Sequence, residues 1–165
     1  MRLAVTRFSR RVLPAVLALA VVMACEVEGR SVIRPYLDEI DALRASIQSD
    51  AAAIGGRFNA LITSGSRDAA AYLAAYGDLR DINADLLGRL RAVTPPNILA
   101  PHHKDFVNGL ADLVSGIDEV MGMIRAGDLP GANLRYQRVE TRSAAAQTGA
   151  MLQIRRVARG LGINP

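Results

Sequence analysis

The chain has two histidines, His102 and His103, and they are adjacent. Neighbouring residues on a helix point about 100° apart, so the two rings do not both face one metal ion well. Antiparallel pairing of helices expected at 99–126 and 132–159 would bring His103 level with Met151. A histidine and a methionine on facing helices can ligate haem or copper, which is one hypothesis for this chain. The other is a hydrogen-bonded core histidine beside a methionine that fills space.

Other catalytic and cofactor signatures are absent from the sequence. A covalent haem site needs two cysteines before a histidine, and the chain has one cysteine. There is no Glu-x-x-His pair for a di-iron site, no serine-nucleophile motif and no glycine-rich phosphate loop. Asp78, Asp81 and Asp85 fall on the side of their helix opposite its apolar stripe. Arg89 follows Asp85 by four residues, so a solvated, ion-paired face is expected there. We therefore expect neither an enzyme nor a resident cofactor.

The single cysteine, Cys25, ends an apolar run near the start of the chain. Residues 1–11 carry four arginines and no acid, and residues 12–24 are uncharged. A positive start, an apolar middle and a small-residue end are the layout of an export signal. The uncharged run would rise only about 20 Å as a helix, against a hydrocarbon core of roughly 30 Å, so a permanent span is not expected. Residues 1–24 are predicted to be a signal peptide.

The segment Val22-Met23-Ala24-Cys25 resembles a bacterial lipobox, in which the cysteine thiol receives a diacylglyceryl group and becomes the new N-terminus. Val22 and Ala24 match that pattern, whereas a smaller or β-branched residue is usual in place of Met23. An ordinary signal peptidase could cut the same bond, because Val22-x-Ala24 also fits its small-residue rule. A lone exported cysteine has no partner for an internal disulfide, which favours lipidation. We expect residues 25–34, with lipid on Cys25, to tether the protein to the outer face of a bacterial membrane.

The route of export is left open by the sequence. Residues 9–13, SRRVL, are similar to part of a twin-arginine signal, which exports folded proteins. Pro14 follows where that pattern usually continues with apolar residues. The pattern favours an arginine-rich start for the general export route.

The basic character of the whole chain belongs to the signal. The chain has 20 Lys+Arg and 16 Asp+Glu, with a sequence pI near 9.8. Four arginines and no acid lie in residues 1–24, which leaves 16 basic and 16 acidic residues. No excess positive charge remains to neutralise phosphates, so nucleic acid is not an expected partner. Arg155, Arg156 and Arg159 complement the end of the last helix and permit contact with anionic headgroups.

Apolar spacing predicts four helices, over about 35–63, 67–92, 99–126 and 132–159. The glycine pair Gly55-Gly56 marks a place where the first helix would kink. The stripe of the third helix is the clearest and that of the fourth is weak. The fourth stripe consists of Leu134, Thr141, Ala145, Thr148, Leu152 and Val157; the third consists of Leu99, His103, Phe106, Leu110, Leu113, Ile117, Val120 and Ile124.

Four long helices joined by short breaks predict an all-α, up-down-up-down antiparallel four-helix bundle over residues 35–160. The stretch from 86 to 132, with its Thr94-Pro95-Pro96 break and Gly127-Asp128 turn, is similar to small bacterial lipoproteins of unknown role. That resemblance implies a helical extracytoplasmic domain and no activity. We expect an accessory or scaffold lipoprotein that binds a protein partner or a small apolar ligand. A haem or copper protein using His103 and Met151 is the alternative.

Overall fold

The structure, a computed structural model, describes residues 31–164. These residues form only helices and their connections, with no strand among them, so the all-α prediction is confirmed. A helical segment covers residues 31–46, and α2 (Gln48–Thr63), α3 (Ala69–Ala92), α4 (Ala100–Arg125) and α5 (Leu129–Gly160) follow. The predicted signal peptide and Cys25 lie outside the described residues, so export and lipidation stay predictions.

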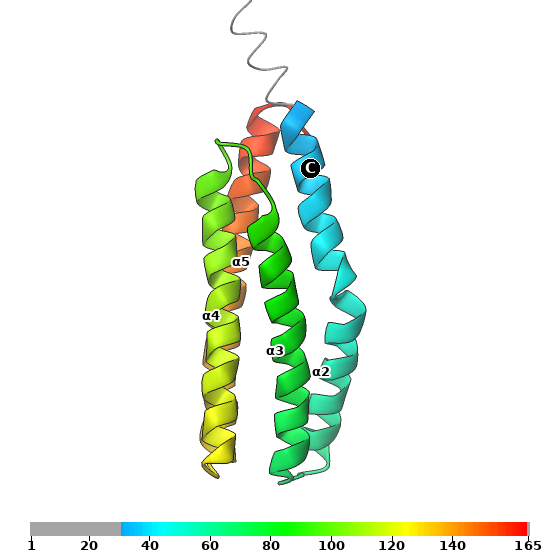
Figure 1. The fold of residues 1–165 in the computed structure, drawn as a ribbon, viewed down its shortest axis with the longest axis vertical. Helices are drawn as coiled ribbons and strands as arrows, with labels where there is room; N and C mark the ends of the chain where they lie inside the picture. Colours follow the sequence, from blue (N-terminus) through cyan, green and yellow to red (C-terminus); the bar gives the residue numbers. More distant parts are fainter. Residues whose placement is uncertain (1–30, 165) are drawn as a thin grey trace, which may run out of the picture.

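The helices pack side by side into an elongated bundle (Figure 1). Hydrogen bonds from Ser143 to Gly109 and from Arg135 to Glu119 show that α4 and α5 run in opposite directions. Arg34 donates to the Asn164 carbonyl at 2.6 Å, so the first and last described residues lie at the same end. We call this the terminal end, and the opposite one, with the turns after α2 and α4, the far end.

The predicted tether is shorter than expected, because residues 31–34 are already helical. Ile33 is 1% exposed and packs with Tyr36 and Leu37 in the core of the terminal end. Burying a side chain of this size is worth roughly 1.5–3 kcal/mol, which offsets the entropy lost in ordering the segment.

The first predicted helix, 35–63, is interrupted at Ile47 and is continuous at Gly55-Gly56, the reverse of the predicted kink. The Ser46 hydroxyl donates to the Leu43 carbonyl at 2.7 Å, and such a side-chain bond to the preceding turn competes with the helix backbone. The glycine pair costs helix propensity but does not exclude helical geometry. The chain changes direction at this break (Figure 1).

Capping residues set where α3 and α5 begin. The Asp68 carboxylate accepts hydrogen bonds from the main chain at the start of α3, at 2.9 and 3.2 Å. Asp128 accepts from the Gly131 N–H at 2.9 Å, and Pro130 lies in the first turn of α5. Aspartate before a helix and proline just inside it are standard start signals, so α5 begins at Leu129 rather than near 132. Pro101 likewise lies in the first turn of α4.

The stripe predicted for the last helix is wrong. Leu134 and Leu152 are 58% and 55% exposed. Apart from Met151, the residues of α5 that are buried recur at four- and seven-residue intervals, yet most of them are small, so a search for large apolar residues misses them. They are Ala132, Val139, Ser143, Ala150, Met151, Ile154 and Ala158.

Two glycines of α4 explain how closely α4 and α5 pack. A Cβ added to Gly116 would lie 2.7 Å from Cγ2 of Val139 and 3.0 Å from its Cβ. A Cβ on Gly109 would lie 3.1 Å from Cβ of Ala146. The bare backbone at these positions therefore lets the two helices approach.

Two apolar clusters fill the bundle, one toward each end. Their most deeply buried members include Leu90, Phe106, Leu110 and Ile154 at the terminal end, and Tyr76, Ile117 and Val120 at the far end. No helix in residues 31–164 is both long and apolar enough to span a bilayer.

Candidate functional site

His103 is a buried side chain whose ring is hydrogen-bonded to Tyr36. The Tyr36 hydroxyl lies 3.0 Å from Nδ1. A hydrogen bond to the Leu90 carbonyl favours the protonated ring. Burial lowers the pKa of His103 below 6.5, against the opposing effect of the Leu90 bond, and raises that of Tyr36 to about 12. The pair is therefore a neutral hydrogen-bonded unit.

This environment makes stability depend on pH. Because the pKa of His103 is lower in the folded than in the unfolded chain, the unfolded chain binds more protons as pH falls through 6.5. We expect the free energy of unfolding to fall toward pH 5, with a slope from this group of up to about 1.4 kcal/mol per pH unit. Denaturant unfolding of His103→Gln at a series of pH values should show a smaller slope. His102→Gln is the matched control, and an unchanged slope in His103→Gln would contradict the assignment.

Met151, the other candidate ligand, is a buried member of the apolar cluster at the terminal end. The hydrogen bond between the Tyr36 hydroxyl and Nδ1 of His103 would have to break before Nδ1 could bind a metal ion. In the described part of the chain no three His, Cys, Asp or Glu side chains are placed to hold a metal ion.

The acidic residues of α3 lie on the surface in ion pairs. Asp78 pairs with Arg57 at 2.7 Å, Asp81 with Arg80 at 3.2 Å, and Asp85 with Arg89 at 3.6 Å. The predicted ion pair between Asp85 and Arg89 is thus confirmed. At this exposure each pair contributes at most about 1 kcal/mol, so the cluster is a solvated face.

A hollow runs along the side of the described bundle. It consists of two adjoining cavities, of about 410 and 500 Å³, which share Arg44, Leu113 and Gln147 as lining residues. We call the two together the lateral groove. Volumes of this order are typical of small-molecule sites. Its apolar wall includes Ile47, Leu86, Phe106, Leu110, Leu113, Met151 and Leu152, and its polar lining includes Asp41, Arg44, Asn83, Glu140, Ser143, Gln147, Thr148 and Arg155.

The break at Ile47 and the packing of its neighbours account for the groove. Past the break, α2 packs on α3, while α5 packs on α4. Arg155 of α5 reaches Asp41 at 3.3 Å on the terminal side of the groove. On the far side the rings of Phe58 and Tyr136 stack with centroids 6.3 Å apart. The groove occupies the stretch between these two cross-contacts.

A polar layer lies at the depth of the groove. The Ser143 hydroxyl donates to the Gly109 carbonyl at 2.7 Å and accepts from Nε2 of Gln147 at 2.8 Å. Asn83, 6% exposed, donates to the Leu79 carbonyl at 2.7 Å. We call Asn83, Ser143 and Gln147 the polar layer. It separates the two apolar clusters and brings amide groups to an otherwise apolar wall.

Two arginines share one carboxylate at the rim of the groove. Arg155 lies 3.3 Å from Asp41, whereas Arg44 lies 3.8 Å from it, the longest of the ion-pair distances in the described chain. Asp41 neutralises one positive charge, so the rim has a local surplus of positive charge at Arg44. Glu140, at the other end of the groove, makes no ion pair with a described residue.

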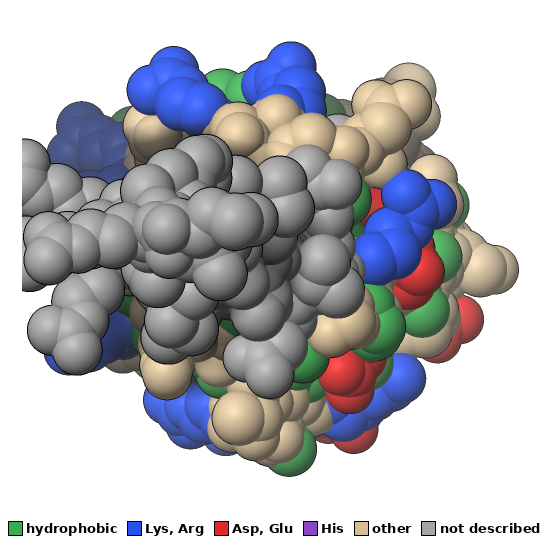
Figure 2. Space-filling view, turned by 90° about the horizontal axis from the view of Figure 1, so that it is seen from above, with side chains coloured by type: hydrophobic (Ala, Val, Ile, Leu, Met, Phe, Trp, Pro, Cys, Tyr) green, Lys and Arg blue, Asp and Glu red, His purple; other side chains and the backbone are tan. Residues whose placement is uncertain are grey.

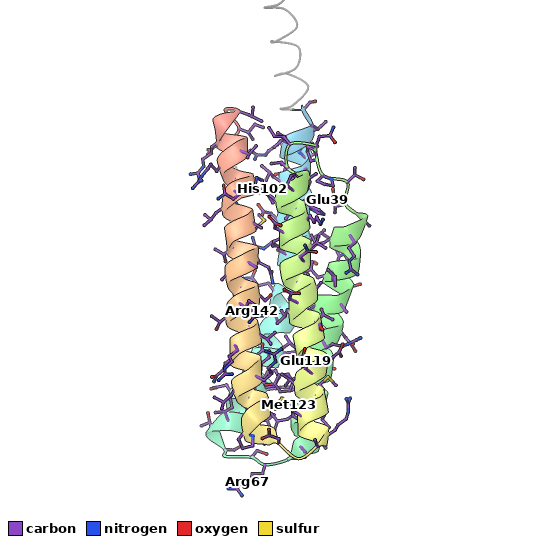
Figure 3. All side chains as sticks on the ribbon, turned by 90° about the vertical axis from the view of Figure 1, so that its left-hand side faces the viewer. Glu39, Arg67, His102, Glu119, Met123 and Arg142 are labelled. Carbon is purple, nitrogen blue, oxygen red and sulfur yellow. The ribbon has the colours of Figure 1, made fainter. Side chains whose placement is uncertain are left out.

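The far end contains an aromatic cluster and a third hollow. Phe58, Tyr76 and Tyr136 contact one another, with ring centroids 4.6 to 6.3 Å apart. Burial, followed by the charge of Glu140, raises the pKa of Tyr136 to about 12, so its hydroxyl stays neutral. A hollow of about 760 Å³ opens between the two far-end turns, with Arg67 at its edge. Figure 3 shows Arg67 projecting away from the bundle.

Basic side chains surround the terminal end. Figure 2, which looks onto that end, shows Lys and Arg side chains around its rim and fewer acids. Arg91, Arg156 and Arg159 are exposed and form no ion pair with another described residue. The equal numbers of basic and acidic residues beyond residue 24 do not reveal that basic side chains gather at this end.

Comparison with known proteins adds no family: no family model, no curated protein and no solved structure matches the chain. The lateral groove is therefore identified as the candidate site from its geometry alone. Sequence reasoning did not select Arg44, Asn83 or Gln147. Asn83 carried a usable signal, because a polar residue on an apolar stripe indicates a buried polar contact.

Proposed function

We propose that the protein is a lipid-anchored, non-catalytic binding lipoprotein of the bacterial cell envelope, and that its lateral groove is the binding site. The groove is the observation that supports binding most directly, because it combines an apolar wall with a few converging polar groups. The lipobox-like segment ending at Cys25 supports the anchor. The sequence led us to expect an accessory or scaffold role. The protein has that role if the molecule bound in the groove is part of another protein assembly of the cell envelope.

A tether from Cys25 enters the described chain at the terminal end, where residue 31 lies. The exposed arginines at that end suit a position beside anionic lipid headgroups, with a contribution of about 1 kcal/mol for each residue near the surface. The groove then opens sideways, parallel to the membrane. An occupant would approach it along the bilayer surface.

The alternative, a haem or copper protein using His103 and Met151, is less well supported. The Tyr36 hydroxyl already bonds Nδ1 of His103, and a ligand role for that nitrogen would leave the hydroxyl without its partner. Unpaired buried polar groups cost about 1–3 kcal/mol each.

The anchor is tested by growing a bacterium that produces the protein on an alkyne-bearing fatty acid. We expect label on the wild type, recovered with membranes, and none on Cys25→Ser. Met23→Ala, which brings the segment closer to the lipobox pattern, is the matched control and should keep the label. An unlabelled wild type, or label on Cys25→Ser, would overturn the anchor. A Soret or copper band in the purified protein would contradict the binding-lipoprotein reading.

A further inference from the structure

We infer that the lateral groove binds a long-chain fatty carboxylate, with the carboxylate at Arg44 and Gln147 and the acyl chain along the apolar wall. This inference rests on the proposed function and names its ligand. The shape of the groove, the charge of Arg44 and the amide of Gln147 support it.

The groove is long and narrow in the direction of α5. Glu140 and Arg155 line the same cavity and are fifteen residues apart, which corresponds to about 22 Å along a helix. Phe106, Leu113 and Met151 lie between these levels and form a continuous apolar wall. A single extended acyl chain fits this shape better than a compact ring system does.

Charge places the head of the ligand where the two cavities meet. Arg44 lines both cavities and is only loosely paired with Asp41, at 3.8 Å, because Arg155 holds that carboxylate at 3.3 Å. An anionic head would pair with Arg44 without displacing a short ion pair. Glu140, at one end of the groove, repels a carboxylate, which fixes the direction of the ligand.

The polar layer supplies the remaining contacts. Gln147 lines both cavities, and its amide makes one hydrogen bond, to Ser143. The second amide N–H of Gln147 remains available to a carboxylate oxygen. Asn83 lines the larger cavity, and its amide nitrogen donates to the Leu79 carbonyl.

The test uses the purified full-length protein and a palmitic acid analogue that carries a diazirine in its chain. After irradiation, we expect label on peptides that contain Leu113 or Met151, with competition by unlabelled palmitate. Ala144→Trp, which fills the groove from an exposed position, should abolish the label. Ala145→Trp, the next residue, lies on the outer furrow between α4 and α5 and should keep it. Melting followed by circular dichroism checks that both variants are folded.

A second pair of variants tests recognition of the carboxylate. Arg44→Gln should raise the palmitate concentration needed for half-maximal competition by about tenfold, the effect of losing one charge-assisted hydrogen bond. Arg142→Gln, at mid-height on α5 and outside the groove, should leave it unchanged (Figure 3). Label elsewhere, label that survives Ala144→Trp, or equal competition by a fatty alcohol would overturn the inference. Absence of label in the wild type, as when a helix of a protein partner is the occupant, would overturn it as well.

The two proposals fail in distinguishable ways. If Cys25 is unmodified and the groove is labelled, the anchor is wrong and the ligand assignment stands. If Cys25 carries a lipid and the groove is not labelled, only the ligand assignment is wrong.

Discussion

Ile154→Ala should lower the free energy of unfolding by about 2–5 kcal/mol. Ile154 is fully buried in the apolar cluster at the terminal end. Alanine would leave a cavity among rigid neighbours, and the loss combines the transfer of the removed methyl groups with the cost of that cavity. Denaturant unfolding followed by circular dichroism measures the change.

The matched control is Leu134→Ala on the same helix. Leu134 belongs to the stripe predicted from the sequence but is 58% exposed in the structure, so its replacement should change stability by no more than about 0.5 kcal/mol. If Leu134→Ala proved the more costly variant, the packed face of α5 would be the predicted one, and the lateral groove would have to be discarded with it.

Gly116→Ala should destabilise the protein by about 1–3 kcal/mol, although alanine is normally the better helix former by about 1 kcal/mol. The new methyl group would overlap the side chain of Val139, which is β-branched and has little freedom to rotate away. Relief would require α4 and α5 to move apart along their whole contact. Thermal and denaturant unfolding should both show the loss.

Two further variants separate crowding from propensity. Gly122→Ala, also on α4 but with no atom within 4 Å of the new Cβ, should stabilise the protein by up to about 1 kcal/mol. Gly116→Ala combined with Val139→Ala should be more stable than the sum of the single changes predicts, because contacting sites couple. Additive effects would mean that the helices do not approach each other at Gly116.

How much of the fold follows from sequence differs between α4 and α5. Every position of the predicted stripe of α4 is a large apolar residue or His103, and nearly all of them are buried, so period alone locates that face. On α5 the contact face is made mostly of alanine and serine, because α4 and α5 approach closely and leave little space for larger side chains. When the close approach of a neighbouring helix determines which residues fit a packing face, the hydrophobicity of that face alone does not identify it.

The site was less predictable than the fold. The break at Ile47 depends on a local bond of Ser46, whereas the sequence pointed to the more obvious glycine pair. The groove forms where α2 and α5 are not in contact. The periodicity of a single helix carries no information about the contacts between two helices. Asn83 was visible in the sequence, because it lies at helical spacing from the apolar residues Leu86 and Leu90. The residues that complete the polar layer come from α5, whose inner face was predicted wrongly.

The polar layer also has a consequence for the alignment of α4 with α5. Two helices that pack only through aliphatic side chains can shift by one turn at little cost, because each aliphatic contact is replaced by another of similar size. A slip here would carry the buried Ser143 hydroxyl away from the Gly109 carbonyl and leave that donor without its acceptor, at about 1–3 kcal/mol. It would also drive Val139 against residues bulkier than glycine. The polar layer thus sets the register of α4 against α5. It adds little to the free energy of unfolding, yet it selects one register from several that the two apolar clusters alone would allow.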